Sequence, residues 1–380
     1  MTLTGMSIPY GYLIGLAFLT IPALPVPRLG ERVGTVVFLL CMAINELPFL
    51  AIGLLAASTA LAFSEGDLTS PVTIAAAVIT TACVASTTWK SVRAQRILQD
   101  AMGAITVTRR VSYTRILLHP FPFRPRSVER TANIAYGPAG KRNLMDAYRH
   151  RSHPTGAPVL IHFHGGYYAM GRKNTQSRPM LHHLASRGWL CISANYRLRP
   201  EAGFEDHLID AKRVIAWVRE HGHEWGADPE RIVLTGSSAG AHMSTMAGFT
   251  QGRSEYQPGF EEVDTSVSAV VGIGGYYGPY FGRGDDTDPF AQARADAPPI
   301  MIVHGDRDSL VHISIARAFA KRLREASCRT VYAELPGAHH GFDVFHSPRF
   351  DAVVGAVEAF AAHAWAQDGQ IGTERPQASG

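Results

Sequence analysis

Long apolar runs fill the first ninety residues of the chain, and a different pattern follows them. Three runs, at residues 8–27, 33–64 and 68–89, contain no charged side chain except Glu46. A helix needs about 20 predominantly apolar residues to cross a bilayer, so each run is long enough for one crossing. The pattern predicts a membrane anchor over residues 1–89, with about three transmembrane helices.

The first two runs leave alternatives open. The first run ends among Pro22, Pro25 and Pro27, and it also resembles a signal peptide, although no basic residues precede it. The second run is longer than the hydrocarbon core is thick, so it must tilt, protrude or break at Pro48. Glu46 is a functional candidate, because carboxylates are costly inside a membrane. The alternative is a protonated or hydrogen-bonded residue that holds the helices together.

Charges in the short loops predict the orientation of the anchor. Basic residues lie between the first two runs and directly after the third, and acidic residues lie between the second and third: Arg28, Arg32, Lys90, Arg93 and Arg96, against Glu65 and Asp67. Positively charged loops tend to stay in the cytoplasm. We therefore expect a multi-pass membrane protein with its N-terminus outside and the remaining domain in the cytoplasm.

A basic segment follows the apolar region. Residues 90–130 hold nine Lys or Arg residues and two acidic ones, Asp100 and Glu129, with apolar residues such as Leu117 and Phe121 among them. Basic and apolar residues beside a membrane predict a helix that lies on anionic lipid headgroups. A solvated linker helix is the alternative. Three prolines between residues 120 and 125 stop helix formation before the next domain.

From residue 131 onward, short apolar runs alternate with longer amphipathic ones. Strands are predicted at residues 131–136, 144–148, 158–162, 190–194, 231–235, 267–273, 300–303 and 330–334, and the clearest helices at residues 207–220, 313–325 and 350–365. Such alternation is typical of an α/β domain with a mostly parallel sheet covered on both faces. We place this domain at residues 131–366, followed by a disordered tail at 367–380.

Composition adds little to this picture. The net charge of +4 and a pI of about 8.9 are only weak evidence for an anionic partner, and we expect no nucleic-acid partner. Cys41, Cys83, Cys191 and Cys328 lack the spacing of a disulfide framework or a zinc site. We expect them to be small buried hydrophobic residues, and we expect neither a metal nor a cofactor.

The sequence Gly-Ser-Ser-Ala-Gly at residues 236–240 predicts a nucleophile elbow. It follows the strand predicted at 231–235 and opens a helical run. A sharp turn of small residues in this context exposes the hydroxyl of the central serine, Ser238, at the helix N-terminus. The motif alone is common by chance, so the strand before it and the helix after it carry the prediction.

The sequence His-Phe-His-Gly-Gly-Tyr, beginning at His162, ends an earlier strand. The N–H groups of Gly165 and Gly166, together with that of Ala239, are candidates for an oxyanion hole, where each donor contributes about 3 kcal/mol. A simple glycine turn is the alternative. We expect His162 and His164 to be structural residues that shape this turn.

Two further motifs each follow a later strand: His-Gly-Asp-Arg-Asp at residues 304–308 and Gly-Ala-His-His-Gly-Phe at 337–342. Active groups of an open parallel sheet gather at the carboxyl ends of its strands. The chain order serine, acid, histidine differs from the orders of chymotrypsin and subtilisin. The pattern alone does not choose between the two acids or between the two histidines.

Together these motifs resemble those of the hormone-sensitive lipase and carboxylesterase family of α/β-hydrolases. The resemblance covers about residues 131–365 and includes Asn-Tyr-Arg-Leu from Asn195 and Gly-Ala-Asp-Pro from Gly226. It implies an α/β-hydrolase fold with an eight-stranded sheet. It also implies Ser238 as the nucleophile of a catalytic triad.

The resemblance also resolves the paired candidates. It implies Asp308 rather than Asp306 as the acid, because the family's acid is the second Asp of its His-Gly-x-x-Asp turn. It implies His340 rather than His339 as the base, because the family's histidine directly precedes Gly-Phe.

Two positions depart from the family pattern. Tyr167 stands where a third glycine is usual, and Ser237 where the family often has Asp. The His-Gly-Gly-Tyr form also resembles aryl formamidases. Separately, Arg197 and Asp210 are candidates for a buried ion pair that serves as scaffold.

We therefore expect a membrane-anchored serine esterase that cleaves carboxylic esters through an acyl-enzyme. An amidase or aryl formamidase with the same triad is the alternative, and a degenerate hydrolase domain in a membrane sensor or transport module is a weaker one. The expected partners are a small ester with an apolar acyl group and membrane lipids, and no nucleic acid.

Overall fold

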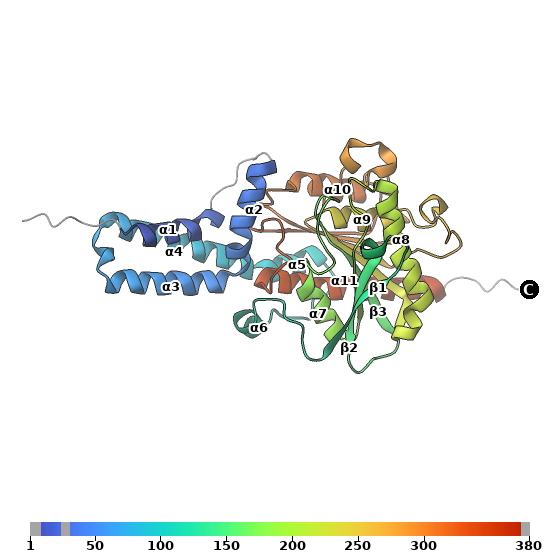
Figure 1. Ribbon diagram of the computed structural model, residues 1–380, viewed down its shortest axis with the longest axis horizontal. Coiled ribbons are helices and arrows are strands. Elements are labelled where there is room, and N and C mark those ends of the chain that lie inside the picture. Colours follow the sequence, from blue (N-terminus) through green and yellow to red (C-terminus); the bar gives the residue numbers. More distant parts are fainter. Residues whose placement is uncertain (1–8, 24–30, 374–380) are drawn as a thin grey trace, which may run out of the picture.

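The computed structural model describes residues 9–23 and 31–373, which form an α/β domain with a helical region at its N-terminal side. Figure 1 shows helices α1, α3 and α4 projecting from one side of the α/β domain, with α2 at the junction. Two parts of the first predicted span, residue 8 and residues 24–27, lie outside the described residues, as does Arg28.

One eight-stranded sheet forms the centre of the α/β domain, in the order β1-β2-β4-β3-β5-β6-β7-β8. β2 is antiparallel to β1 and to β4, and the other neighbours are parallel. The strands are β1 (Val128–Ala135), β2 (Leu144–His150), β3 (Ala157–Phe163), β4 (Leu190–Ala194), β5 (Ala227–Ser237), β6 (Ala269–Ile273), β7 (Ile300–Gly305) and β8 (Thr330–Leu335). The predicted eight-stranded, mostly parallel sheet is confirmed.

Helices cover both faces of this sheet. They are α7 (Arg178–Ser186), α8 (Phe204–His221), α9 (Ala239–Phe249), α10 (Ile313–Glu325) and α11 (Pro348–Thr373). Strand side chains alternate between the faces: in β5, Ile232 and Leu234 pack in the core under α8, α9 and α10, whereas Val233 packs in the core under α5, α7 and α11. α11 continues to Thr373, into the predicted tail, and residues 374–380 lie outside the described part.

Short 3₁₀ helices connect several of these elements. They lie at Ile21–Ala23, Asp67–Thr69, Gly140–Asn143, Gly222–Trp225, Ser254–Tyr256, Tyr280–Gly282 and Asp285–Thr287.

The N-terminal region consists of α1 (Tyr10–Thr20), α2 (Glu31–Glu46), α3 (Pro48–Ser64), α4 (Pro71–Val92), α5 (Ala94–Met102) and α6 (Tyr113–Leu118). α1, α3 and α4 pack together around Leu16, Leu55 and Val84. Within the described residues, one helical stretch, Pro71–Met102, is long and apolar enough to cross a membrane, while Tyr10–Ala23 and Pro48–Ser64 are apolar but shorter. The prediction of about three full-length spans is therefore corrected to one candidate.

The second predicted span divides into two helices. α2 ends at Glu46, and α3 begins at Pro48. Proline has no N–H to donate and its ring clashes with the preceding turn, so one helix cannot run through this point without a break. Glu46 is 1% exposed and pairs with Arg349 of the α/β domain, so the end of α2 is a packed part of that domain.

The basic segment 90–130 also differs from its prediction. The apolar face of α5, with Ala94, Leu98 and Met102, is buried in the core beneath the sheet, where α5 contacts α11 and β8. Because that face packs against protein, α5 does not offer it to lipid headgroups. The most exposed large apolar residues of this segment lie in and after α6, at Leu117, Leu118 and Phe123.

Candidate active site

Ser238 sits in a sharp turn between β5 and α9, as the motif predicts. Its backbone angles are φ 57° and ψ −120°, a conformation that costs a non-glycine residue about 1–3 kcal/mol. The turn is tight: a Cβ atom at Gly236 would lie 2.1 Å from the carbonyl oxygen of Gly240, and one at Gly240 would lie 2.1 Å from that of Phe163. Both glycines are therefore required by close backbone contact.

Asp308 and His340 form a buried hydrogen-bonded pair at the carboxyl ends of β7 and β8. Oδ2 of Asp308 lies 2.7 Å from Nδ1 of His340. Oδ1 of Asp308 accepts hydrogen bonds from the backbone N–H groups of Leu310 (2.9 Å) and Val311 (2.8 Å). Nε2 of His304 lies 3.3 Å from Oδ2 of Asp308. The carboxylate is therefore fixed in direction, and it fixes the ring of His340.

The charges of this pair shift both pKa values. Burial alone would lower the pKa of His340, but attraction and hydrogen bonding to Asp308, with a further contribution from Asp343, raise it above its ordinary value. Burial alone would raise the pKa of Asp308, and the neighbouring His340 and His304 outweigh burial and lower it. Asp308 thus stays ionised while His340 accepts a proton.

The alternative acid and histidine lie in different positions. Oδ1 of Asp306 accepts a hydrogen bond from the N–H of Gly337 (2.6 Å), so Asp306 braces the start of the His340 loop. His339 is 1% exposed, and burial lowers its pKa to about 4. The structure brings Asp308, and not Asp306, to His340, as the resemblance implies.

The glycine turn after β3 lies directly against the elbow. A Cβ atom at Gly165 would lie 2.7 Å from the Cβ of Ser238, so only glycine fits there. The N–H of Gly165 donates to Oε1 of Gln176 (2.7 Å). In the described part of the chain, no hydrogen bond uses the N–H of Gly166 or of Ala239. The N–H groups of Gly166 and Ala239 can therefore donate to an oxyanion, whereas the N–H of Gly165 is already hydrogen-bonded to Gln176.

Histidines around this turn are buried and act as scaffold. His164 stacks on Tyr196 with ring centroids 4.5 Å apart, and its Nδ1 lies 2.7 Å from the carbonyl oxygen of Gly165. Burial lowers the pKa of His162 to about 3 and that of His164 to about 4, so both rings are neutral. Nδ1 of His242 lies 2.7 Å from the hydroxyl of Tyr168, deep in α9.

Sequence reasoning missed one carboxylate beside the elbow. Asp343 is 1% exposed and follows the His-Gly-Phe motif by one residue. Its Oδ2 accepts hydrogen bonds from the hydroxyls of Ser237 and, at 2.7 Å, Ser177. Ser237 is the position where the resembling family often has Asp, so here a buried acid reaches the same place from another loop. An Asp this close to the histidine motif was the available signal.

A cavity of about 280 Å³ opens in front of Ser238. Its wall is mainly aromatic and apolar, formed by Tyr167, Tyr168, Ala239, His242, Tyr276, Tyr280, Phe281, Leu310 and Val311. The left-handed φ of Tyr167 (55°) and of Tyr168 (58°) belongs to the turn in which a third glycine is usual. The aromatic rings of both tyrosines thus form part of the cavity wall in front of the nucleophile.

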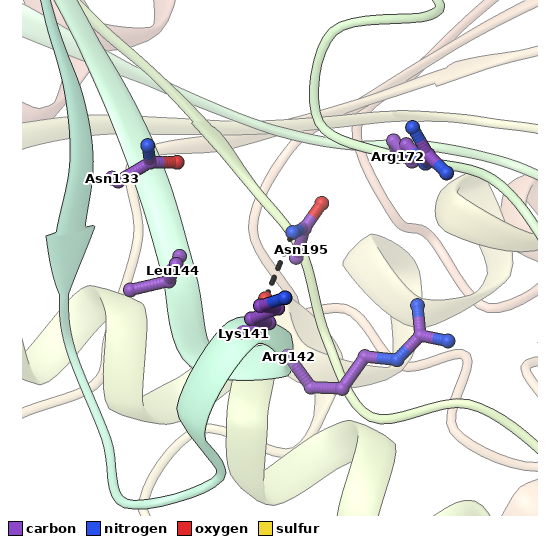
Figure 2. Close-up of a pocket in the computed structure, with 6 residues that line it drawn as sticks. All are labelled: Asn133, Lys141, Arg142, Leu144, Arg172 and Asn195. Atoms are coloured by element: carbon purple, nitrogen blue, oxygen red, sulfur yellow. Dashed lines mark hydrogen bonds between the residues drawn. The ribbon is translucent and has the colours of Figure 1, made fainter.

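A larger cavity of about 550 Å³, with basic residues in its wall, lies where β1 and β2 meet the 3₁₀ helix Gly140–Asn143 (Figure 2). Its lining residues are Asn133, Lys141, Arg142, Leu144, Arg172 and Asn195. Nδ2 of Asn195 donates to the carbonyl oxygen of Lys141 (3.0 Å), which holds this wall together. None of the triad candidates lines this cavity, so the smaller one is the candidate substrate site.

Arg197 and Asp210 form the ion pair that the sequence suggested. Nη2 of Arg197 lies 2.9 Å from Oδ1 of Asp210, and the pair is only partly buried because 31% of the Arg197 side chain is exposed. The cysteines are free thiols, and Cys83 is only partly buried. Among the described residues, no group of three or more His, Cys, Asp or Glu side chains is placed to hold a metal ion.

Comparison with known families supports an esterase fold. Residues 145–280 match the family model BD-FAE. The chain is similar in fold to Esterase B from Lactobacillus rhamnosis, with a TM-score of 0.58, 20% identity and coverage of 66% of this chain and 91% of that one. It is also similar to Thermogutta terrifontis esterase 2, with a TM-score of 0.54, 24% identity and coverage of 68% and 99%. These likenesses establish the α/β-hydrolase fold.

Two curated relatives come from Mycobacterium tuberculosis. Esterase LipQ is 33% identical over 350 residues, which cover 77% of this chain and 81% of LipQ. The probable carboxylic ester hydrolase LipM is 39% identical over 270 residues, which cover 63% of this chain and 63% of LipM. The match thus spans less than two thirds of LipM but most of LipQ, including part of the N-terminal helical region of this chain.

Proposed function

We propose that this chain, which belongs to the esterase family of carboxylic ester hydrolases that includes LipQ, cleaves its esters with Ser238 as the nucleophile. The observation that carries the proposal is the 2.7 Å contact between Asp308 and His340 at the same sheet edge as the strained serine. A serine, a base and an orienting acid in this chain order are the elements of acyl transfer.

In the proposed reaction, His340 removes the proton from Ser238 as its Oγ attacks the ester carbonyl carbon. The N–H groups of Gly166 and Ala239 donate hydrogen bonds to the tetrahedral oxyanion. The C–O bond to the alcohol breaks, and the alcohol leaves with the proton from His340. Water, deprotonated by His340, then attacks the acyl-enzyme, and the carboxylic acid departs. Asp308 holds the ring orientation and stabilises the imidazolium in both half-reactions.

The substrate class follows from the cavity at Ser238. A volume of about 280 Å³ lies near the lower end of small-molecule sites, and its wall carries Tyr276, Phe281, Leu310 and Val311. We propose esters with a small apolar acyl group. Apolar surface gains about 25 cal/mol per Å² on burial, so acyl groups that fit this cavity gain affinity with each methylene until the cavity is full.

The test is hydrolysis of p-nitrophenyl esters of graded acyl length by the purified full-length protein in detergent. We expect activity that passes through a maximum at a short or medium chain, with fluorophosphonate labelling at Ser238. N-formyl anilides in a parallel assay test the amidase alternative, because the same triad serves both reactions. Absence of ester hydrolysis, with labelling elsewhere or nowhere, would contradict the proposal.

We also propose that the bundle of α1, α3 and α4 inserts in a membrane. Support comes from large apolar side chains that face outward from it, including Leu61 (58% exposed), Phe63 (76%), Val72 (68%) and Val78 (63%). Exposed apolar surface on this scale is unusual for a water-soluble domain. α4 forms most of Pro71–Met102, the stretch of the described residues that has the length and apolarity of a span.

The proposed orientation places the α/β domain in the cytoplasm. α4 begins after the acidic residues Glu65 and Asp67 and ends beside Lys90 and Arg93. Basic residues after a span favour the cytoplasmic side. The α/β domain follows α4 on that side, and its ester substrate and the membrane lipids are then its proposed partners.

A further inference from the structure

Helix α2 packs against the loop that carries His340. Phe38 of α2 meets the ring of His340 edge-on, with ring centroids 5.8 Å apart and an angle of 73° between the ring planes. A Cβ atom at Gly341 would lie 2.8 Å from Cε2 of Phe38 and 3.2 Å from Sδ of Met42. The helix therefore lies in close contact with the loop at Gly341, whose left-handed φ of 72° itself favours glycine.

A buried ion pair fixes the end of α2 in this position. Nη1 of Arg349 donates to Oε1 of Glu46, across 303 residues of sequence. The side chains of Arg349 and Glu46 are 0% and 1% exposed. Buried charges are costly unless paired, so each of these residues strongly constrains where the other lies.

Arg349 of this pair and the neighbouring Asn45 each bind a backbone carbonyl of the loop. Nδ2 of Asn45 donates to the carbonyl oxygen of Gly337 (2.9 Å) and to Oε1 of Glu46 (2.9 Å). Nη2 of Arg349 donates to the carbonyl oxygen of Pro336 (3.1 Å). Pro336 and Gly337 begin the loop that ends in His340. On its other side the N–H of Gly337 donates to Asp306, so the beginning of this loop is held from two directions.

We propose that Glu46 is a positioning residue for the hydrolytic reaction, acting through Arg349 and Asn45 on the His340 loop. The inference rests on the esterase function proposed above. It gives α2 a second role besides joining the helical bundle to the α/β domain: its end sets the position of the catalytic base. Because the pair contacts the loop and not the substrate cavity, its loss lowers the rate of the chemical step and leaves substrate binding nearly unchanged.

A purely structural role makes a different prediction. If the ion pair only stabilised the fold, its loss would reduce the fraction of folded protein, and each folded molecule would keep the wild-type rate. Asp351 offers the matched control. It is also nearly buried, at 3% exposure, lies two residues from Arg349 at the start of α11 and binds Arg109 and the N–H of Ser112, but no atom of the His340 loop.

The experiment compares Glu46→Ala, Glu46→Gln, Asn45→Ala and Asp351→Asn in the full chain. Turnover of a short p-nitrophenyl ester is divided by the number of active sites, counted by fluorophosphonate labelling. We expect Glu46→Ala to lower kcat per labelled site about 10- to 100-fold, since small displacements of a catalytic group have effects of this size. KM should change by less than about twofold, because uniform binding is untouched.

The milder substitutions at this site should cause smaller losses of kcat than Glu46→Ala. Glu46→Gln keeps an oxygen that accepts from Arg349 and should lose less activity than Glu46→Ala. Asn45→Ala, which removes one loop contact without leaving a charge unpaired, should lower kcat modestly and remain folded. Asp351→Asn should lower the melting temperature while its kcat per labelled site stays at the wild-type level.

Three outcomes overturn the inference. One is a Glu46→Ala protein with unchanged kcat per labelled site. Another is an Asp351→Asn protein that loses as much kcat per labelled site as Glu46→Ala. The third applies if Glu46→Ala fails to fold: Asn45→Ala with wild-type kcat then rejects the positioning role. A wild-type protein without ester hydrolysis rejects the proposed function instead, so the two failures are distinguishable.

Discussion

Oδ2 of Asp308 lies 2.7 Å from Nδ1 of His340, and both residues are only 6% exposed. A carboxylate at Nδ1 favours the tautomer that carries its proton there, which leaves Nε2 free to accept the proton of the serine. Asp308 is itself held by two backbone N–H groups and by His304. The orientation of the base is therefore set by a chain of contacts that begins in the turn after β7.

Asp308→Asn should lower kcat far more than Asp306→Asn. The amide cannot hold the same tautomer or stabilise the imidazolium, and the corresponding loss in a triad is about 10⁴-fold. The side chain of Asp306 accepts a hydrogen bond from the N–H of Gly337, and an Asn side chain retains an oxygen that can accept it. Steady-state kinetics with one ester substrate measures the loss of kcat in both variants. Equal losses, or a larger loss for Asp306→Asn, would mean that the acid is assigned to the wrong residue.

The wild-type pH profile should have its acidic limb above the ordinary histidine pKa of about 6.5. The pKa of His340 is raised, chiefly by Asp308 acting against burial, and only neutral His340 accepts a proton. Activity should therefore be complete above the raised pKa and decline as the pH falls through it. Measurement of kcat/KM from pH 5 to 9 locates the midpoint. A midpoint below 6.5 would contradict the stabilisation of protonated His340 by Asp308.

Asp343→Asn should shift that limb toward lower pH and reduce kcat. The negative charge of Asp343 contributes to the raised pKa of His340, so its removal destabilises the imidazolium. Ser177→Ala is the control, because it removes one hydrogen bond to Asp343 and leaves the charge in place. Its acidic limb should stay where the wild-type limb is. An unchanged limb in Asp343→Asn would show that the charge of Asp343 does not act on His340.

The sequence was most informative where local pattern decides structure. The run at 190–194 coincides with β4, and the helix predicted at 313–325 coincides with α10, because apolar periodicity and end signals lie within each window. β5 is longer than predicted, from Ala227 to Ser237, since its first residue already pairs with Ala157 of β3. That extension depends on a neighbour far away in the sequence.

Glu46 and Asp343 show where the sequence stopped being informative. Glu46 lies in an apolar run and had no charged partner in the predicted spans. Its partner, Arg349, is 303 residues away, and only the folded chain brings them together. Asp343 likewise meets Ser237 across 106 residues. Apolar periodicity is a property of a short stretch of sequence. It therefore cannot predict contacts between residues that are more than a hundred positions apart.

Ser238→Ala should abolish ester hydrolysis and fluorophosphonate labelling while the protein remains folded. Loss of a triad serine costs about 10⁶-fold in turnover. The substitution removes only the side-chain hydroxyl of Ser238. The backbone of the turn depends on Gly236 and Gly240, so the melting temperature should change little. Labelling that persists at the wild-type rate would identify another nucleophile. Ser237→Ala, whose hydroxyl binds Asp343, should still be labelled and serves as the neighbouring control.

The last prediction tests the proposal that the bundle of α1, α3 and α4 inserts in a membrane with the α/β domain on the cytoplasmic side. Glu65 and Asp67 precede α4, whereas Lys90 and Arg93 mark its other end, next to the catalytic domain. A C-terminal fluorescent protein that folds only in the cytoplasm should therefore be bright, and an alkaline phosphatase fusion should be inactive. Replacing Lys90, Arg93 and Arg96 by Gln should weaken the preference of the α/β domain for the cytoplasmic side, because basic residues beside a span favour that side. Fusions with the opposite pair of signals would place the domain outside, and the assignment of Ser238, Asp308 and His340 would stand unchanged.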